Sequence, residues 1–353
     1  MRKFVKFLLP ILVISSMNIT SCKNKEDAKV LLSFGDVHSE GCKKIDALEL
    51  NQIVLRQESF ILVINSETCG CWSEFKPNLT KYVVENKLLC YQLPSSEFFG
   101  SPEYTKDLGL TKVSPSSTTL AIFENGKHKK SINTNDNSEL MYDFNNFSKY
   151  MERNVVLPKC FLIRKDDVSI IKNSDKNAIV YFERSGCGDC SALNPTILYS
   201  YIKNHQNMNN IFVLDCQPYY KSPGSDDYDS YIAFKDEMGL STINNPVYGY
   251  NAGVFPFFSY IENGEYKSGC VVYNDEYEEQ DGKVIITDSY YTTERIEHLD
   301  YTTTVLKGME LPNDQLQIGA TRKIWSRDGQ NKTYEKILAS FLDAKLPLVS
   351  YNF

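Results

Sequence analysis

The sequence predicts an α/β protein with two domains of similar plan, the second carrying insertions. Apolar runs of strand length alternate with segments of helical spacing along the 353 residues. The same order of elements then recurs. Residues 69–77 and 187–195 each run from a cysteine to a proline, and 257–265 echo 119–127. Such recurrence is typical of internal duplication.

Composition narrows the class of protein further. With 42% hydrophobic and 12% aromatic residues, the chain can bury the cores of two domains. The formal net charge is -7, which argues against a protein that binds nucleic acid by neutralising phosphates. We therefore expect no nucleic-acid partner.

Residues 1–21 have the features of an export signal. Arg2, Lys3 and Lys6 precede a mostly apolar stretch that ends before Cys22, and this stretch is shorter than the ~18 residues needed to span a bilayer. The segment resembles a bacterial lipoprotein signal, which implies that Cys22 is lipidated and becomes the new N-terminus. Ordinary secretion or a retained anchor is the alternative. In each case the body of the protein lies outside the cytoplasm, and lipidation would attach it to the cell membrane.

The rest of the chain divides into a polar tether over 22–40, a first domain over 41–156 and a second domain over 157–353, with Pro158 in the linker. In the first domain we expect strands at 53–55, 60–65, 88–91 and 120–123, and helices over 74–86, 104–110 and 138–153. In the second we expect strands at 178–182, 211–214 and from 257, and helices over 191–205 and 338–346.

The segment Cys187-Gly188-Asp189-Cys190 joins a predicted strand to a predicted helix. Unpaired amides and the dipole at a helix N-terminus stabilise a thiolate. A second cysteine at this spacing can then close a disulfide with the first. The same spacing is half of many zinc sites, but the four histidines are scattered singly and no second such pair occurs. We therefore favour a redox pair with an accessible Cys187, no metal and no cofactor.

The other cysteines are interpreted in the light of export, because thiol pairs outside the cytoplasm are structural disulfides or redox centres. Cys69-Gly70-Cys71 is a second candidate redox pair in the first domain. Cys42 and Cys160 receive no role. Three cysteines lie within apolar runs and are predicted to be small core residues: Cys90, Cys216 and Cys270.

The second domain has the order strand, Cys-x-x-Cys, proline-containing helix, strand, short helix, Phe-Pro, strand, turn, strand and terminal helix. This order resembles the thioredoxin superfamily, which implies two thioredoxin-like domains, each with a central mixed sheet flanked by helices. Pro195 matches the kink proline of that family, and Pro256 matches its cis-proline. The resemblance implies that Cys187 attacks a partner disulfide and that Cys190 resolves the mixed disulfide. It also implies a substrate-binding edge formed by four residues: Phe255, Pro256, Gly188 and Asp189.

The sequence departs from the family in three places. Tyr181 and Val63 stand six residues before the first cysteines, where thioredoxins keep a buried acid. Trp72 replaces a resolving cysteine in the first domain, and Thr118 stands at the position of the cis-proline, so a trans bond is expected there. The first domain is therefore either a second redox centre or a degenerate domain kept for binding or electron relay.

Charges near the pair do not settle the direction of electron flow, because Asp189 should disfavour a Cys187 thiolate and Arg184 should favour it. Two acidic, tyrosine-rich insertions, 217–231 and 273–325, would form a partner-selecting rim or would pack on the domain, and packing is favoured.

These features together predict an extracytoplasmic, membrane-anchored thiol-disulfide oxidoreductase that acts on protein disulfides. Its expected partners are exported proteins that contain cysteines and a membrane redox partner. The alternatives are a redox-inactive binding or chaperone-like lipoprotein on the same scaffold, for example an export accessory, and a metal-binding lipoprotein.

Overall fold

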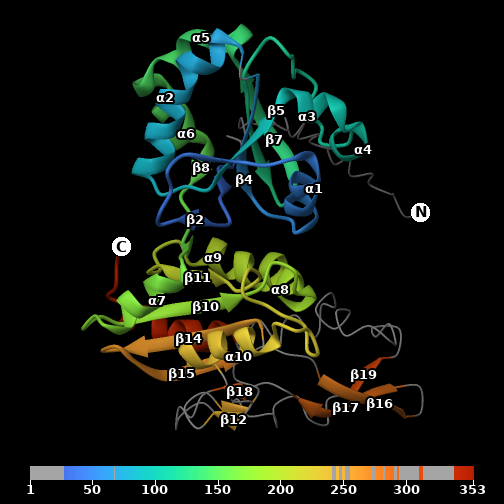
Figure 1. The fold of residues 1–353 in the computed structure, drawn as a ribbon, viewed down its shortest axis with the longest axis vertical. Coiled ribbons are helices and arrows are strands. Elements are labelled where there is room, and N and C mark those ends of the chain that lie inside the picture. Colours follow the sequence, from blue (N-terminus) through green and yellow to red (C-terminus); the bar gives the residue numbers. More distant parts are fainter. Residues whose placement is uncertain are drawn as a thin grey trace, which may run out of the picture.

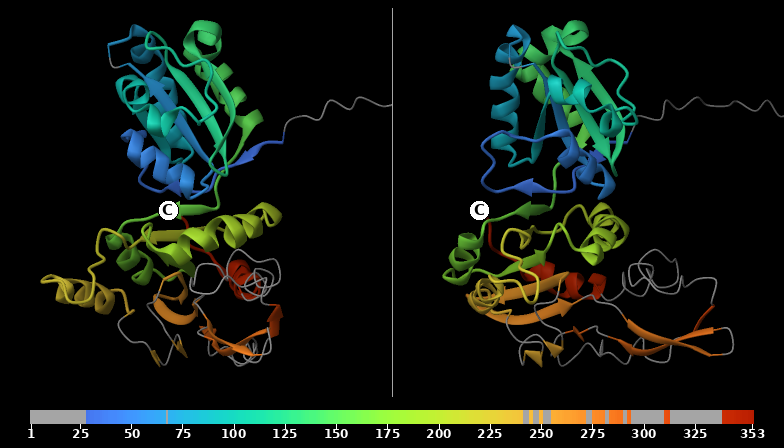
Figure 2. Two further views of the ribbon diagram at one scale, coloured as in Figure 1. Left: turned by 90° about the vertical axis from the view of Figure 1, so that its right-hand side faces the viewer. Right: turned by 45° about the vertical axis from the view of Figure 1, so that its right-hand side comes forward.

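The computed structural model describes residues 28–66, 68–240, 244–245, 249–250, 255–271, 275–280, 283–289, 292–293, 310–312 and 338–353. The predicted signal and the lipidation site at Cys22 lie outside these residues. The chain forms two lobes stacked along the longest axis, and the C-terminus lies close to their junction (Figures 1 and 2).

The first domain is built on a five-stranded mixed sheet in the order β3-β5-β4-β6-β7. The first three strands are parallel, and the last two are antiparallel to their neighbours. Every residue of β4 is buried, as expected for the central strand of a sheet covered on both faces. The strands are β3 (Cys42–Lys44), β4 (Phe60–Asn65), β5 (Cys90–Pro94), β6 (Thr119–Glu124) and β7 (Lys127–Asn133).

Helices cover both faces of this sheet. Helices α2, α5 and α6 pack on one face, and α1 and α3 pack on the other. The predicted strand at 53–55 is wrong, because these residues end helix α1, which begins after an Asp46 cap that is paired with Glu49. The helices are α1 (Ala47–Leu55), α2 (Gly70–Glu85), α3 (Ser95–Gly100), α4 (Pro102–Thr105), α5 (Thr134–Tyr142) and α6 (Phe144–Asn154).

The second domain repeats this strand order within a larger sheet, β18-β15-β14-β10-β11-β9-β2. Its five inner strands correspond in order and direction to β7, β6, β4, β5 and β3. Both domains therefore have the thioredoxin-like arrangement of a central mixed sheet flanked by helices. The strands are β2 (Gly35–Asp36), β9 (Cys160–Leu162), β10 (Ala178–Glu183), β11 (Ile211–Asp215), β14 (Phe257–Glu262), β15 (Glu265–Val271) and β18 (Thr292–Thr293).

The helix predicted over 191–205 is formed by three consecutive segments. Pro195 lies in a π-helical segment between two α-helices, as expected where a proline interrupts the hydrogen-bond ladder. The closing helix over 338–345 packs on the same face of the sheet through Leu338, Phe341 and Leu342. The helical elements are α7 (Lys165–Lys172), α8 (Gly188–Leu193), η1 (Asn194–Leu198), α9 (Tyr199–Asn204), α10 (Tyr228–Glu237) and η5 (Leu346–Leu348).

Part of the predicted tether is folded and joins the two domains. Strand β1 (Val30–Leu31) pairs with β8 (Val155–Val156), and β2 forms the edge of the second sheet beside β9. Gly35 also bridges Leu88 of the first domain. A Cβ on Gly35 would lie 2.5 Å from the Lys87 carbonyl oxygen and 2.6 Å from the Phe161 ring, so this close approach requires glycine.

The second predicted insertion, 273–325, is described only in part, whereas the first, 217–231, lies wholly within the described residues. In the second insertion, β16 (Asp275–Gln280), β17 (Lys283–Ser289) and β19 (Glu310–Pro312) form a three-stranded sheet. Most of the remainder of that insertion, and with it the choice between a rim and packing on the domain, lies outside the described residues. Strands β12 (Asn244–Asn245) and β13 (Gly249–Tyr250), which belong to neither insertion, form a small antiparallel pair.

Candidate redox site

Cys187 lies where strand β10 hands over to helix α8. It caps the helix with extended backbone angles, φ -86 and ψ 127, and its carbonyl oxygen accepts a hydrogen bond from the Ser191 amide at 3.0 Å. Cys190 lies one turn further along the same helix. The structure therefore brings the two predicted redox cysteines together, and both are free thiols.

The two thiols have opposite pKa shifts. The Cys190 thiol donates a hydrogen bond to the Cys187 sulfur, and this bond is the main cause that lowers the pKa of Cys187 to about 6. The backbone amides of Cys190 and Asp189 lower this pKa further, whereas burial and the charge of Asp189 raise it. Burial, followed by the interaction with Cys187, raises the pKa of Cys190 well above its usual value. At neutral pH the first sulfur is therefore a thiolate and the second remains a thiol.

The accessibility expected for Cys187 is wrong. The residue is only 8% exposed, because it packs in the core beside Cys190 and Phe255. Its sulfur lies 3.8 Å from the Phe255 carbonyl oxygen, so the predicted substrate-binding edge does lie beside the sulfur. Gly188 and Asp189 are half-buried. The Cys187 side chain therefore offers little exposed surface to a partner disulfide.

The peptide bond between Phe255 and Pro256 is cis, as the resemblance implies. It is the one cis bond within the described ranges, so the bond before Thr118 is trans, which confirms the expectation for the first domain.

The loop before Cys187 is held by strand β11 and the residues after it. Asp215 Oδ1 accepts a hydrogen bond from the Ser185 amide at 3.0 Å, and Gln217 Oε1 accepts one from the Gly186 amide at 3.0 Å. The Arg184 guanidinium lies 4.0 Å from the centroid of the Tyr220 ring and donates to Gln217. Arg184 is therefore engaged with the loop, whereas the charge of Asp189 raises the pKa of Cys187, as expected.

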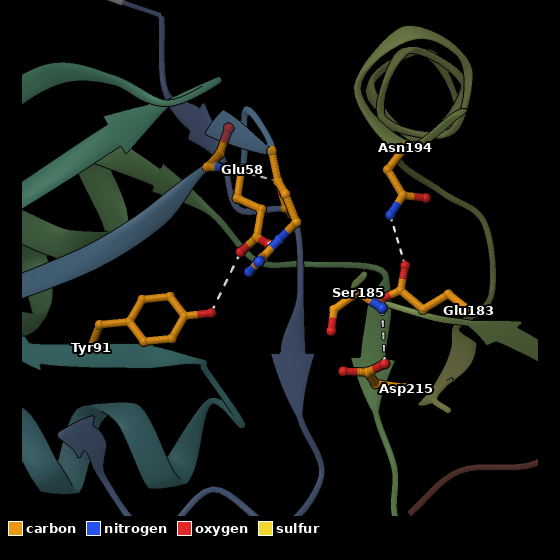
Figure 3. Close-up of polar contacts among 9 residues, drawn as sticks. Glu58, Tyr91, Glu183, Ser185, Asn194 and Asp215 are labelled. Atoms are coloured by element: carbon orange, nitrogen blue, oxygen red, sulfur yellow. Dashed lines mark hydrogen bonds and ion pairs between the residues drawn. The ribbon is translucent and has the colours of Figure 1, made fainter. Parts of the chain in front are cut away.

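A buried acid near the pair was missed by the sequence argument. Glu183, the last residue of β10, is 6% exposed and accepts a hydrogen bond from Asn194 Nδ2 at 2.8 Å (Figure 3). Burial, followed by the charge of Asp215, raises the pKa of Glu183 to about 8. The carboxyl interacts electrostatically with Cys190. The available signal was an acidic residue ending an apolar strand directly before the cysteine loop.

In the first domain, Cys69 and Cys71 form a disulfide at the start of α2. The Cys71 amide donates to the Cys69 sulfur at 3.2 Å, and the Cys71 sulfur lies 3.5 Å from Thr118 Oγ1. Both cysteines are half-buried, whereas Trp72 is 7% exposed. This pair therefore differs from the second-domain pair both in oxidation state and in exposure.

Cys90 is a buried core residue, as predicted, and it also forms a disulfide with Cys42, which was not predicted. The two cysteines face each other in register on the parallel strands β3 and β5. Cys216 and Cys270 are buried core residues, as predicted, and Cys160 is also buried.

The tyrosines of the first insertion pack on the domain, as favoured. Tyr219 stacks on Phe234 at 4.5 Å between ring centroids, and Tyr220 contacts Tyr231 at 5.2 Å. Within the described ranges, no cluster of three or more metal-ligating side chains occurs. None of the helices in those ranges has both the length and the apolar character needed to span a bilayer.

Comparison with solved structures returns thioredoxin-fold proteins. Thioredoxin f from spinach chloroplast is 12% identical, with a TM-score of 0.24, and the match covers 32% of this chain and 93% of that chain. Thioredoxin from Aeropyrum pernix is 16% identical, with a TM-score of 0.22 and coverages of 31% and 82%. Human ERp44 is 8% identical, with a TM-score of 0.31, over 72% of this chain and 52% of its own.

These identities and TM-scores are low, so no function is inferred from them. No protein-family model matches the sequence, and no curated protein matches it.

Proposed function

We propose that this chain is a thiol-disulfide oxidoreductase in which Cys187 is the nucleophile and Cys190 is the resolving cysteine. The observation that carries the proposal is the opposite pKa shifts of two adjacent thiols. A thiolate with a pKa of about 6 is populated at neutral pH, whereas its partner keeps the proton that it later gives up.

The reaction transfers two electrons between disulfides. The Cys187 thiolate attacks one sulfur of a partner disulfide, which forms a mixed disulfide and releases the other partner sulfur as a thiolate that takes a proton from water. Cys190 then loses its proton, and its sulfur attacks the Cys187 sulfur. The second partner sulfur leaves and is protonated. The partner disulfide is reduced, the Cys187–Cys190 pair is oxidised, and the reverse sequence oxidises a partner dithiol.

Glu183 is the proposed proton acceptor for Cys190. It is buried on the strand that leads to the pair, and burial holds its pKa to about 8, close to the working range of an acid-base group at neutral pH. The ionised form of Glu183, whose population rises as the pH approaches 8, takes the thiol proton during the resolving step, and the proton then returns to the departing partner sulfur. Asn194 fixes the orientation of the carboxyl through its amide.

We place this activity outside the cytoplasm, on exported proteins that contain cysteines, with the chain attached to the membrane through Cys22 and reoxidised or reduced by a membrane redox partner. The support is the basic and apolar start of the sequence and the cysteine at its end. Metabolic labelling with palmitate tests the anchor, because Cys22→Ser should abolish incorporation; equal labelling of both proteins would contradict it.

The test of the redox role compares insulin reduction and the refolding of scrambled ribonuclease for the wild type, Cys187→Ser and Cys69→Ser. Cys187→Ser should reduce both activities to background, and Cys216→Ser serves as the matched control because it removes another buried free thiol of the same domain. Wild-type rates in Cys187→Ser would overturn the proposal. A large loss in Cys69→Ser would assign the first-domain pair a part in the reaction.

The low exposure of Cys187 favours a second candidate, a redox-inactive binding or chaperone-like module on the same scaffold. The two functions differ in the need for a free thiol. Complete alkylation of Cys187 should abolish activity in an oxidoreductase and leave it intact in a binding module, with binding of an unfolded client peptide as the second readout.

A further inference from the structure

A half-open cavity of about 770 Å³ lies between the two domains and is lined by residues of both. On the first-domain side lie Arg56, Glu58 and Tyr91, and on the second-domain side lie Glu183 and Asp215. Figure 3 shows Glu58 and Tyr91 facing Glu183, Ser185 and Asp215 across this space. The carboxyl of Glu183 therefore faces the first domain across this cavity.

An ion pair of the first domain lies at this cavity, in which Glu58 is buried and the Arg56 side chain is 27% exposed. Glu58 is 5% exposed, and its Oε1 accepts a hydrogen bond from Arg56 Nε at 2.7 Å. Its Oε2 lies 3.4 Å from the Tyr91 hydroxyl, and Tyr91 is 6% exposed. Burying an ion pair is costly in free energy, and such a pair is weak evidence for a purely stabilising role.

The relative position of the two domains is held by backbone contacts. The Ser33 amide donates to the Ser59 carbonyl oxygen at 2.9 Å, next to Glu58 in the chain. The Asp36 amide donates to the Lys87 carbonyl oxygen at 2.9 Å, and β2 pairs with β9 in the second sheet. These contacts hold the Arg56–Glu58 pair in place opposite Glu183.

We propose that the Arg56–Glu58 pair acts across the cavity as a positioning pair that sets the fraction of Glu183 that is protonated. The first domain thereby sets the pH range in which the redox pair of the second domain works. This inference rests on the proposed function of Cys187 and Cys190. It assigns the first domain a role that does not depend on its own disulfide.

The charges of the pair act on Glu183 in opposite directions. After burial and Asp215, Glu58 raises the pKa of Glu183 and Arg56 lowers it, and the effect of Glu58 is the larger. The titratable groups that interact electrostatically with Glu183 from all the surrounding elements are Arg56, Glu58, Tyr91, Cys160, Tyr181, Cys190, Tyr199, Asp215 and Cys216.

Substitutions of the pair should therefore shift the protonation of Glu183 by different amounts. Glu58→Gln removes the negative charge and leaves Arg56 uncompensated, and both changes favour the ionised form of Glu183. The double variant Arg56→Gln with Glu58→Gln removes both charges and should produce a smaller shift in the same direction. Glu49→Gln is the matched control, because Glu49 lines the same cavity but is exposed to solvent.

The experiment uses the full chain with a chromophoric aromatic thiol, 2-nitro-5-thiobenzoate, attached to Cys187 as a mixed disulfide. Attack by Cys190 releases the coloured thiol, and the first-order rate is followed against pH. We expect an inflection near pH 8 in the wild type from Glu183. Glu58→Gln should lower this inflection by about one pH unit, the double variant should lie between, and Glu49→Gln should match the wild type.

Each outcome decides one question. Unchanged inflections in Glu58→Gln and in the double variant would overturn the inference while leaving the proposed function intact. A wild-type release rate equal to that of Cys190→Ser would show that the proposed function itself fails. If the pair were merely structural, the inflection of the double variant would deviate more from the wild type than that of Glu58→Gln. The double variant leaves no buried unpaired charge, so it still provides the test if Glu58→Gln does not fold.

Discussion

Equivalent strands of the two domains end in residues of different chemistry. Strand β10 ends at Glu183 and strand β4 ends at Asn65, each four residues before the first cysteine of its domain. Glu183 is ionisable and hydrogen-bonded to Asn194. Asn65 is 0% exposed, and within the described residues its amide nitrogen and oxygen have no hydrogen-bond partner.

This difference separates the two cysteine pairs by what their surroundings can do. At this position the second domain has a buried carboxyl group, Glu183, beside two free thiols. In the first domain the position holds a neutral amide, and the adjacent Cys69–Cys71 pair is already a disulfide. The same framework therefore presents a reduced pair beside a buried acid in one domain and an oxidised pair beside a neutral amide in the other.

A second difference between the domains is a disulfide that links two strands of the sheet in the first domain. In the first domain Cys42 and Cys90 join strands β3 and β5 across a sequence separation of 48 residues. In the second domain, Cys160 on β9 faces Ile211 on β11 in the corresponding register. The second domain lacks the disulfide there and depends on packing alone.

The largest expected effect follows from removing that disulfide. Cys42→Ser should lower the free energy of unfolding of the first domain by about 4 kcal/mol, because the crosslink restricts a long loop in the unfolded chain. Denaturant unfolding measured under oxidising conditions checks this. Cys270→Ser, in the core of the second domain, is the control. An unchanged midpoint in Cys42→Ser would mean that the disulfide contributes no stability.

The next largest effect is expected from a substitution that gives the second domain the neutral amide of the first. Glu183→Gln supplies the neutral amide group found at Asn65, and the resolving step should slow by about 100-fold because the buried proton acceptor is lost. Release of a coloured thiol from Cys187 measures the rate, and the inflection near pH 8 should disappear. Retention of both the rate and the inflection would exclude Glu183 as the acceptor.

A smaller effect is expected from a substitution that gives the second domain a disulfide like the one in the first. Ile211→Cys should pair with Cys160, because the two positions are register partners as Cys42 and Cys90 are. After the loss of the buried side chain of Ile211, we expect a net gain of about 2 kcal/mol in stability. Comparison of unfolding with and without a reducing agent measures the gain. Two free thiols after oxidation would show that the registers differ.

The smallest effect concerns the unpaired amide of the first domain. Asn65→Leu replaces two unsatisfied polar atoms by an apolar group of similar size, and it should stabilise the first domain by about 1 kcal/mol. Thermal unfolding of the full chain checks this, with Ser66→Ala as the neighbouring control. Destabilisation would mean that the amide makes a hydrogen bond in solution.

Much of the fold followed from the sequence, because buried strands leave continuous apolar runs. The runs at 60–65 and 178–182 predicted β4 and β10 nearly to the residue. Helix α1 was predicted in part as a strand, because Ile53, Val54 and Leu55 alone fit either period. The capping signal at Asp46 and Glu49, which favours a helix, lies in a polar stretch that was assigned no element.

The site was predictable as far as local spacing determines it. The proximity of Cys187 and Cys190 to Phe255-Pro256, which the resemblance to the thioredoxin superfamily implied, is observed. The Cys42–Cys90 disulfide depends on the pairing of a short edge strand with no apolar signal, and Glu183 is buried beside a cavity that residues of both domains line. Both are consequences of tertiary structure, and spacing along the chain does not encode them.

The central claim is that Cys187 is a reactive thiolate despite its low exposure. The most direct measurement is the rate of alkylation of Cys187 by iodoacetamide in the native chain between pH 4 and 10, read by mass spectrometry. Because the thiolate is the reacting form, the rate should rise with pH through a midpoint near 6 and then level off. A midpoint near 9, or a Cys187 that reacts only after unfolding, would contradict the account.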